Sequence, residues 1–365
     1  MKRRDEFLVF GVTLLVYALT YWDRSPYDAH VRQAVAFLHG HAYIDAPHFI
    51  EHAQIGAYSY QLHPPLPAIL LMPFAAFWGM STNQNWFALV VGALDVTLAY
   101  RLLGKIRCPR IWLTVFFGLG TIMWYESVNG ASWEVSMLVA VMMTLLALNE
   151  VFGKQRGWIV GLWAGLAALA RYDLALVWPV YTLMIPPREW LRLAPGFALG
   201  IVGYVGFNFV RYHSPFDLGV GSYLYTTPEA GKNLFAIRYL PNNLYTLIFM
   251  APGLDDTFPY FHPKFGGQSI LTTSPGFLLA LRASWRRADV RLIAFATVLS
   301  AAPVLFYVGN GSSQFGTRHF VAVFPFLLVL MAMGNPKLDQ MGKTLIVASV
   351  CLIALGIYSI RMGGL

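Results

Sequence analysis

The chain has 365 residues, of which 57% are hydrophobic and only 12% are charged, whereas a typical soluble chain is about 45–50% hydrophobic and about 25% charged. Its 26 basic and 18 acidic residues give a formal charge of +8, and so few charges cannot cover the surface of a soluble protein of this size. The composition therefore excludes a soluble protein and predicts an integral membrane protein with many spans. Two cysteines exclude a disulfide framework or a cysteine-rich metal site.

The apolar segments predict an all-α polytopic membrane protein. The basic start Lys2-Arg3-Arg4 precedes an apolar run without a small-x-small cleavage site, which favours a retained first span over a signal peptide. Because a span needs about 20 apolar residues, we expect about eleven transmembrane helices, although the two short segments near Trp158 and Trp178 could instead form a re-entrant pair. The candidates are 7–22, 85–103, 111–125, 132–152, 157–170, 174–186, 193–210, 270–283, 291–308, 319–334 and 344–360.

Segment 64–79 decides the topology. If it does not cross the membrane, 17 of the 26 basic residues lie inside and 9 outside; if it crosses, 10 lie inside and 16 outside. The positive-inside rule favours the first arrangement, with 64–79 as an interfacial helix. We therefore expect a plasma (inner) membrane protein with a cytoplasmic N-terminus. The positive charge then reports orientation, and we expect no nucleic-acid partner.

This topology predicts one transmembrane domain, 1–365, with long outer loops at 23–84 and 211–269. Because the inner loops are short, we expect the functional site on the outer face. In the first outer loop, Ser25-Pro26-Tyr27-Asp28 predicts a helix start with Ser25 as N-cap and Asp28 at N3. The helix carries an apolar stripe and ends at Gly40, as expected of an amphipathic helix at the membrane surface. The stripe comprises Val31, Ala34, Val35 and Leu38.

The first outer loop concentrates titratable side chains. It holds six of the nine histidines and four carboxylates: His30, His39, His41, His48, His52 and His63, with Asp23, Asp28, Asp45 and Glu51. Histidine is common at membrane interfaces, so this clustering has two interpretations, interfacial anchoring and an acid/base or phosphate-binding site. A metal site at His48 and His52 requires that 47–54 be helical and has no evident third ligand. No cofactor is certain, and the sequence leaves a divalent metal open.

The carboxylates differ in how well local rules explain them. Asp28 at N3, with Arg32 four residues on, needs no catalytic role. Asp23 lies at the outer end of the first span, where a carboxylate must be hydrated, paired or functional. No local rule explains Glu51. Asp23 and Glu51 are therefore better candidates for chemistry than Asp28.

Other polar residues fall at predicted outer boundaries. Arg171 and Asp173 form either a surface ion pair or part of a site. Arg318-His319 follow a glycine-rich loop and open a late span; an arginine there suits a lipid phosphate, or anchors the span at the interface. Lys264 in the second outer loop is a further candidate cation, and Asp95 in mid-span is either functional or paired within the bundle.

Three stretches of the chain resemble the GT-C superfamily of polytopic glycosyltransferases, which includes the protein O-mannosyltransferases and the aminoarabinose transferases of lipid A. The first is the span with the outer acidic loop, SPYDAHVRQAVAFLHG and YSYQLHPPLPAILLMPFAAFWG. The second is NFVRYHSPFDLG with FGGQSILTTSPGFLLALRA, and the third is SSQFGTRHFVAVFPFLLVL, similar to the family's Gly-x-Arg segment.

The resemblance implies transfer of a sugar from a polyprenyl-phosphate donor to a glycan, lipid or protein acceptor on the outer leaflet, usually with inversion. It implies a loop carboxylate as general base, Asp23 or Asp28, and Arg318 on the donor phosphate. His63 stands where relatives often have lysine. We expect the remaining substrate-binding candidates to be His30, Arg171, Lys264 and His319.

This chain departs from the family in two respects. Many relatives have an Asp-Glu pair after the first span, whereas the stretch here reads Asp23-Arg24-Ser25, so Glu51 stays possible as the base. No soluble domain is expected after the last span, so acceptor recognition would come from the outer loops. Two alternatives also stay open, a transporter or lipid flippase and an inactive scaffold with this fold. The lack of midplane polar residues beyond Asp95 disfavours the transporter.

Overall fold

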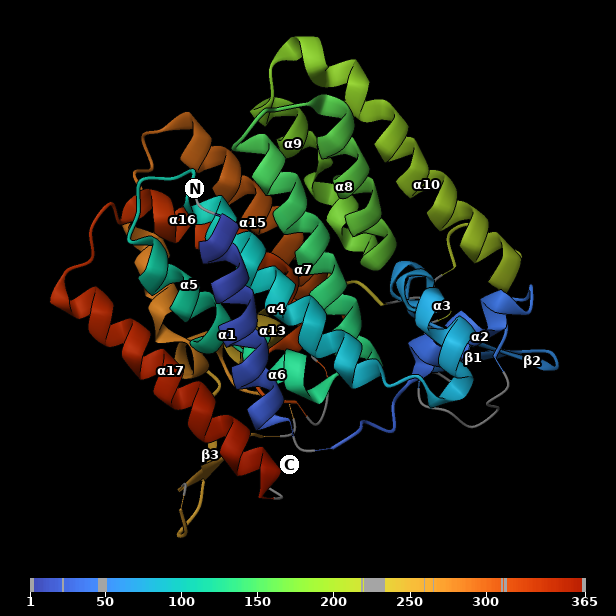
Figure 1. Cartoon of the computed structure of the whole chain (residues 1–365), viewed down its shortest axis with the longest axis horizontal. Coiled ribbons are helices and arrows are strands. Elements are labelled where there is room, and N and C mark those ends of the chain that lie inside the picture. The colour runs from blue at the N-terminus through green and yellow to red at the C-terminus, as the bar shows by residue number, and fades with distance from the viewer. Residues whose placement is uncertain are drawn as a thin grey trace.

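The computed structural model describes residues 3–21, 23–44, 51–217, 219, 234–258, 260–264, 266–309, 311 and 314–362. Helices dominate these ranges (Figure 1), and two short antiparallel hairpins accompany them. The longer helices are α1 (Arg3–Thr20), α2 (Ala29–Leu38), α3 (Leu66–Trp78), α4 (Gln84–Leu103), α5 (Arg110–Leu119), α7 (Ser132–Val151), α8 (Gly157–Ala170), α10 (Trp190–Tyr212), α13 (Leu240–Ile248), α15 (Ala288–Phe306), α16 (Phe324–Gly334) and α17 (Gln340–Arg361).

Shorter elements connect the long helices. The short α-helices are α6 (Met123–Asn129), α9 (Trp178–Met184) and α14 (Ile270–Thr273). The 3₁₀ segments are η1 (Gly79–Ser81), η2 (Tyr172–Val177), η3 (Pro187–Glu189), η4 (Ile237–Tyr239), η5 (Pro275–Arg282) and η6 (Arg318–Val323). The hairpins pair β1 (His52–Ile55) with β2 (Tyr58–Gln61) and β3 (Gly253–Leu254) with β4 (Phe261–His262).

Helices α1 and α4 are antiparallel neighbours near the middle of the bundle (Figure 1). At one end, Nη2 of Arg101 lies 2.5 Å from Oε2 of Glu6, which joins the end of α4 to the start of α1. At the other end, the backbone N–H of Ser25, just after α1, donates to Oδ1 of Asn85 at the start of α4, 3.0 Å away. Segment 23–84 therefore leaves and re-enters the bundle at the same end.

The apolar helices are those of a multi-pass membrane protein. In the described ranges, five helices are long and apolar enough to cross a membrane: α4, α7, α10, α15 and α17. Helices α5 and α6, bent by 44°, form a sixth span if taken together, and α8 and segments 66–81 and 318–334 are apolar but shorter. The predicted count of eleven is not confirmed. Hydropathy does not reveal the breaks and 3₁₀ turns that divide several of these apolar runs, such as 174–186 and 319–334.

Glycines join α8 and α10 into one close-packed pair. Gly161 on α8 faces Gly196 on α10, and a Cβ built on Gly196 would lie 2.0 Å from the carbonyl carbon of Gly161. Similarly, a Cβ on Gly165 would lie 2.0 Å from the carbonyl oxygen of Gly196. Without side chains the two backbones come into contact, the packing that small residues allow between membrane helices. These two helices form one wall of the cavity described below.

The predicted start of the first loop helix is wrong. Helix α2 begins at Ala29, and Asp28 occupies the N-cap position without a side-chain capping bond. The physical reason is tertiary: Oγ of Ser132 on α7 accepts from the N–H of Ala29 at 2.8 Å, and Asn85 accepts from the N–H of Ser25. The N–H of Ser25, which a capping box would bond to the Asp28 side chain, is thus bound by α4 instead, and the N–H of Ala29 is bound by α7.

The amphipathic character of α2 is confirmed. Val31 and Ala34 are fully buried against Ala68 and Leu71 of α3. The helix ends at Leu38, and Gly40 follows with φ +81°, a conformation that favours glycine. Leu38, predicted in the same stripe, is 42% exposed. The α2–α3 pair lies beside the C-terminal end of α10 (Figure 1).

Candidate active site

A β-hairpin brings Glu51 and His63 together. Strand β1 starts one residue after Glu51 and β2 ends two residues before His63, with His52 paired to Gln61. Gly56, with φ 60°, opens the two-residue turn between the strands. The ladder continues with the N–H of Leu62, which donates to the carbonyl of Glu51 at 3.2 Å. Nε2 of His63 consequently lies 2.9 Å from Oε2 of Glu51.

The hairpin removes the condition for a metal site at His48 and His52. A helix over 47–54 would put His48 and His52 on one face, but His52 begins a strand. His48 and Asp45 lie outside the described residues. Within the described ranges, no three His, Cys, Asp or Glu side chains are grouped so that they could hold a metal ion.

Glu51 is held in an unusual conformation and kept ionised. Its φ is 61°, in the left-handed region that a residue other than glycine adopts at a cost of about 1–3 kcal/mol. Burial by itself raises the pKa of the carboxyl, but the hydrogen bond with His63 and the charges of His63 and Arg318 outweigh burial, so the pKa is lowered. Glu51 is therefore a strained carboxylate that stays deprotonated at neutral pH.

Glu51 and His63 line a cavity of about 1020 Å³. Its polar lining also includes Arg171, Asp173 and His319, while most of the remaining lining is apolar. The apolar lining comes from several helical segments, among them Ala168 and Ala170 of α8, Ala175 and Leu176 of η2, Ile201 and Val205 of α10, and Ala302, Pro303, Val304 and Phe306 of α15. The cavity thus combines a small charged group with an extended apolar surface.

The basic side chains lie close enough to act on one another. Arg171 forms a two-bond pair with Asp173, with N···O distances of 3.0 and 2.9 Å, and the pair lies in the cavity wall rather than on an open surface. The charges of Arg171, His63 and Arg318 all act on His319. Arg318 is 5% exposed, and its guanidinium carbon lies 4.7 Å from the ring centroid of Trp133, a cavity-lining residue.

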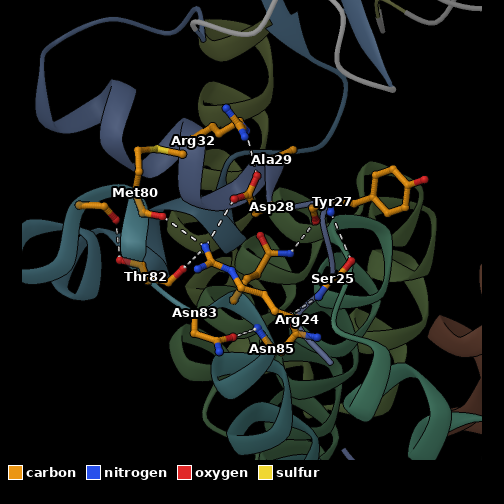
Figure 2. A network of polar contacts seen from close by, with 12 residues as sticks. Arg24, Ser25, Tyr27, Asp28, Ala29, Arg32, Met80, Thr82, Asn83 and Asn85 are labelled. Atoms are coloured by element: carbon orange, nitrogen blue, oxygen red, sulfur yellow. Dashed lines mark hydrogen bonds and ion pairs between the residues drawn. The ribbon is translucent and has the colours of Figure 1, made fainter. Parts of the chain in front are cut away.

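Asp28 is part of a structural network outside the cavity lining (Figure 2). Arg32 donates to it across one helical turn at 2.8 Å, and Nη2 of Arg24 lies 3.6 Å from its other oxygen. Arg24 also donates to the carbonyls of Met80 and Thr82. The network ties the first loop to the α3–α4 connection. The pairing of Asp28 with Arg32 predicted from the sequence is confirmed.

Three other predicted residues also lie outside the cavity lining as far as the structure describes it. Asp23 is exposed, and its Oδ1 accepts from the N–H of Arg24 at 2.7 Å. Lys264 is exposed next to strand β4. His30 is fully buried and links α2 to α7: its Nε2 lies 2.8 Å from the carbonyl oxygen of Ser132, which makes Nε2 the donor. Burial and the nearby His63 lower the pKa of His30 well below its usual value, so it is neutral.

Sequence reasoning missed several charged residues around the cavity. Glu126 and Glu134 flank the short loop between α6 and α7, are both almost fully buried, and interact electrostatically with Arg318. The sequence does indicate these two glutamates, because two acidic residues at the edge of an apolar span need a partner. Arg211 at the end of α10 is fully buried and was also missed as a functional residue.

Two solved structures share this architecture. ArnT from Cupriavidus metallidurans, crystallised with undecaprenyl phosphate, matches over 95% of this chain and 63% of its own, with a TM-score of 0.57 and 15% identity. The Archaeoglobus fulgidus oligosaccharyltransferase in its apo form matches over 96% of this chain and 56% of its own, with a TM-score of 0.54 and 13% identity. No family model and no curated protein matches the sequence.

The chain spans about three-fifths of the length of these two proteins. Both are polytopic glycosyltransferases of the GT-C superfamily, and the chain has the GT-C fold. The superfamily resemblance seen in the sequence is thereby confirmed at the level of fold.

Proposed function

We propose that this chain is a glycosyltransferase that moves a sugar from a polyprenyl-phosphate donor to an acceptor on the outer face of the membrane. The observation that carries the proposal is the cavity, in which the Glu51–His63 pair and the Arg171–Asp173 pair adjoin an extended apolar wall. A donor of this class has the same two parts, a charged phosphosugar and a long hydrocarbon chain. ArnT, with the same fold, was crystallised with undecaprenyl phosphate.

Glu51 is the proposed general base. The acceptor hydroxyl oxygen attacks the anomeric carbon of the sugar, its proton passes to the Glu51 carboxylate, and the bond from the anomeric carbon to the phosphate oxygen breaks. The products are the glycosylated acceptor and polyprenyl phosphate, with inversion at the anomeric carbon. Glu51 suits the base role because its carboxylate is deprotonated at neutral pH and because it lies in the cavity wall.

The basic residues are proposed to stabilise the leaving phosphate. Arg171 and His319 line the cavity, and Arg318 is positioned behind them to add its charge. Negative charge grows on the phosphate as the bond breaks, so fixed cations in a largely apolar cavity lower the barrier. Asp173 holds the Arg171 fork in one orientation through its two hydrogen bonds.

The apolar wall is proposed to hold the polyprenyl chain. Its α8–α10 part is kept rigid by backbone contact at the glycines, and α15 contributes Pro303 and Phe306. Burial of hydrocarbon against such a surface stabilises binding by roughly 25 cal/mol per Å². The sugar identity, whether hexose or pentose, would be selected by the charged part of the cavity.

The orientation is also a proposal. We propose that the protein resides in the plasma (inner) membrane as one domain with a cytoplasmic N-terminus, so that the cavity opens to the outer face. The excess of basic residues in loops at the end of the bundle that holds Glu6 and Arg101 supports this orientation. A membrane-impermeant maleimide should label Lys264→Cys in intact cells, but Lys154→Cys only after permeabilisation; the reverse pattern would overturn the orientation.

The choice of base is tested by three isosteric variants in one transfer assay with polyprenyl-phosphate-linked sugars. Glu51→Gln should lower turnover by about 10²–10⁴-fold, the usual contribution of a general base. Asp23→Asn should retain turnover, and Asp28→Asn should retain it while losing about 1 kcal/mol of stability from its broken ion pairs. Loss of turnover in Asp23→Asn with full activity in Glu51→Gln would move the base role to Asp23.

A further inference from the structure

Arg211 is a fully buried arginine in the last turn of α10. Its Nη1 donates to the carbonyl oxygen of Gln61 at 2.5 Å and lies 3.4 Å from that of His63. Its Nη2 donates to the hydroxyl of Tyr172 at 3.1 Å and to Oδ1 of Asn208 at 2.6 Å. One guanidinium thus contacts three separate parts of the chain.

The charge of Arg211 has no acidic partner among the described residues, since no carboxylate there lies within 4.0 Å of the guanidinium nitrogens. Its guanidinium carbon lies 3.9 Å from the ring centroid of Phe207 and 4.4 Å from that of Tyr212. Within the described residues, the buried charge is compensated by carbonyls, a phenol, an amide and two ring faces. Burial of a charge without an ionic partner costs free energy of folding even when hydrogen bonds are made. We therefore infer that Arg211 has a role other than stabilising the fold.

The contacts of Arg211 lie next to both ion pairs of the cavity. Gln61 ends β2 and His63 follows two residues later, and the His63 side chain pairs with Glu51. On the other side, Tyr172 stands between Arg171 and Asp173, which pair with each other in the cavity wall. The planar guanidinium of Arg211 therefore fixes the hairpin that holds Glu51 and His63 relative to the segment that holds Arg171.

We propose that Arg211 is a positioning residue that sets the separation between the Glu51–His63 pair and the Arg171–Asp173 pair. This inference rests on the proposed transfer reaction for its consequence in catalysis. The distance between the base and the phosphate-binding cation determines whether the acceptor hydroxyl and the anomeric carbon meet in a reactive geometry. An error of about 1 Å in such positioning can cost about 10²-fold in rate.

Arg211→Lys tests the proposal, because lysine keeps the charge but cannot reach both sides with one planar fork. In the polyprenyl-phosphate transfer assay we expect kcat to fall about 10–100-fold with little change in the KM for the donor, since the apolar wall is untouched. Tyr172→Phe removes only one of the four contacts and should give a smaller fall in kcat. The control is Arg110→Lys, which alters an arginine stacked on Tyr100 that is remote from the cavity and should leave kcat unchanged.

Hydrogen–deuterium exchange measures the positioning without reference to activity. Arg211→Lys should raise exchange in peptides covering 58–66 and 168–176 together, because one side chain holds both, while Arg110→Lys should leave both unchanged. Wild-type kcat, or unchanged exchange in either segment, would overturn the positioning role. If Arg211→Lys does not fold, Tyr172→Phe tests the proposal through the same two measurements, kcat and hydrogen–deuterium exchange. If the wild type transfers no sugar but the exchange changes appear, the proposed function fails and the structural role of Arg211 stands.

Discussion

Glu51 and His63 form the pair on which the proposed chemistry depends. Nε2 of His63 lies 2.9 Å from the Glu51 carboxylate, and its hydrogen bond and charge counteract the effect of burial on the pKa of Glu51. A base with a lowered pKa loses its function only when the pH falls below the ordinary glutamate value of about 4.3. Acid inactivation through this residue should therefore begin at unusually low pH.

The pH profile tests this coupling. In His63→Gln the hydrogen bond and charge are lost, burial acts with less opposition, and the pKa of Glu51 rises. We expect the acid limb of kcat/KM to move to higher pH in this variant, measured from about pH 3 to about pH 8 so that the range extends below the reference glutamate pKa of about 4.3. His39→Gln, at an exposed histidine of the same loop, serves as control and should leave the limb in place. An unmoved acid limb in His63→Gln would show that another group is the base.

At the same scale, the sequence identified the titratable residues of the first loop but not their partners. The histidine cluster and the unexplained Glu51 lie in the loop that carries the proposed base. Local rules ranked Asp28 below Asp23 and Glu51 but could not separate Asp23 from Glu51, because the contacts of both are fixed by folding. Arg211 was not identified because its contacts to Gln61 span 150 positions in the chain.

At the scale of the elements, periodicity and hydropathy predicted most of the long helices, including α4, α7, α8 and α10, within a few residues. The start of α2 was missed because the N–H groups of Ser25 and Ala29 bond to α4 and α7, so that the helix begins at Ala29 and not at Pro26. The β1–β2 hairpin was not predicted at all. Its alternation is short, and no local sequence rule predicts the left-handed φ of Glu51 just before it.

The α8–α10 wall gives the sharpest prediction at this scale. Gly196→Ala places a methyl group 2.0 Å from the backbone of Gly161, so the helices must separate, and we expect a loss of at least about 2 kcal/mol, the size of a large packing defect. Gly206→Ala on the same helix meets no atom within 4 Å and should be neutral or stabilising by up to about 1 kcal/mol. Thermal unfolding in detergent compares the two variants, and equal stabilities would contradict the proposed close packing.

At the scale of the whole molecule, composition and charge predicted a polytopic membrane protein, and the resemblance of three stretches to the GT-C superfamily implied its architecture. The number of spans could not be predicted, because apolar runs that read as spans are broken by 3₁₀ turns and a 44° bend. The same fold places the hairpin segment of Glu51 and the η2 segment of Arg171 against one cavity. That convergence supports transfer at a membrane-embedded donor rather than passage of a solute through the midplane.

The most direct test of the account is the conversion of polyprenyl-phosphate-linked sugars to polyprenyl phosphate by the purified protein in proteoliposomes, followed by mass spectrometry. We predict that the wild type releases polyprenyl phosphate from at least one hexosyl or pentosyl donor, and that Glu51→Gln still binds undecaprenyl phosphate but releases about 1% as much or less. Movement of the intact donor between leaflets without release of polyprenyl phosphate, or equal release by wild type and Glu51→Gln, would contradict the account.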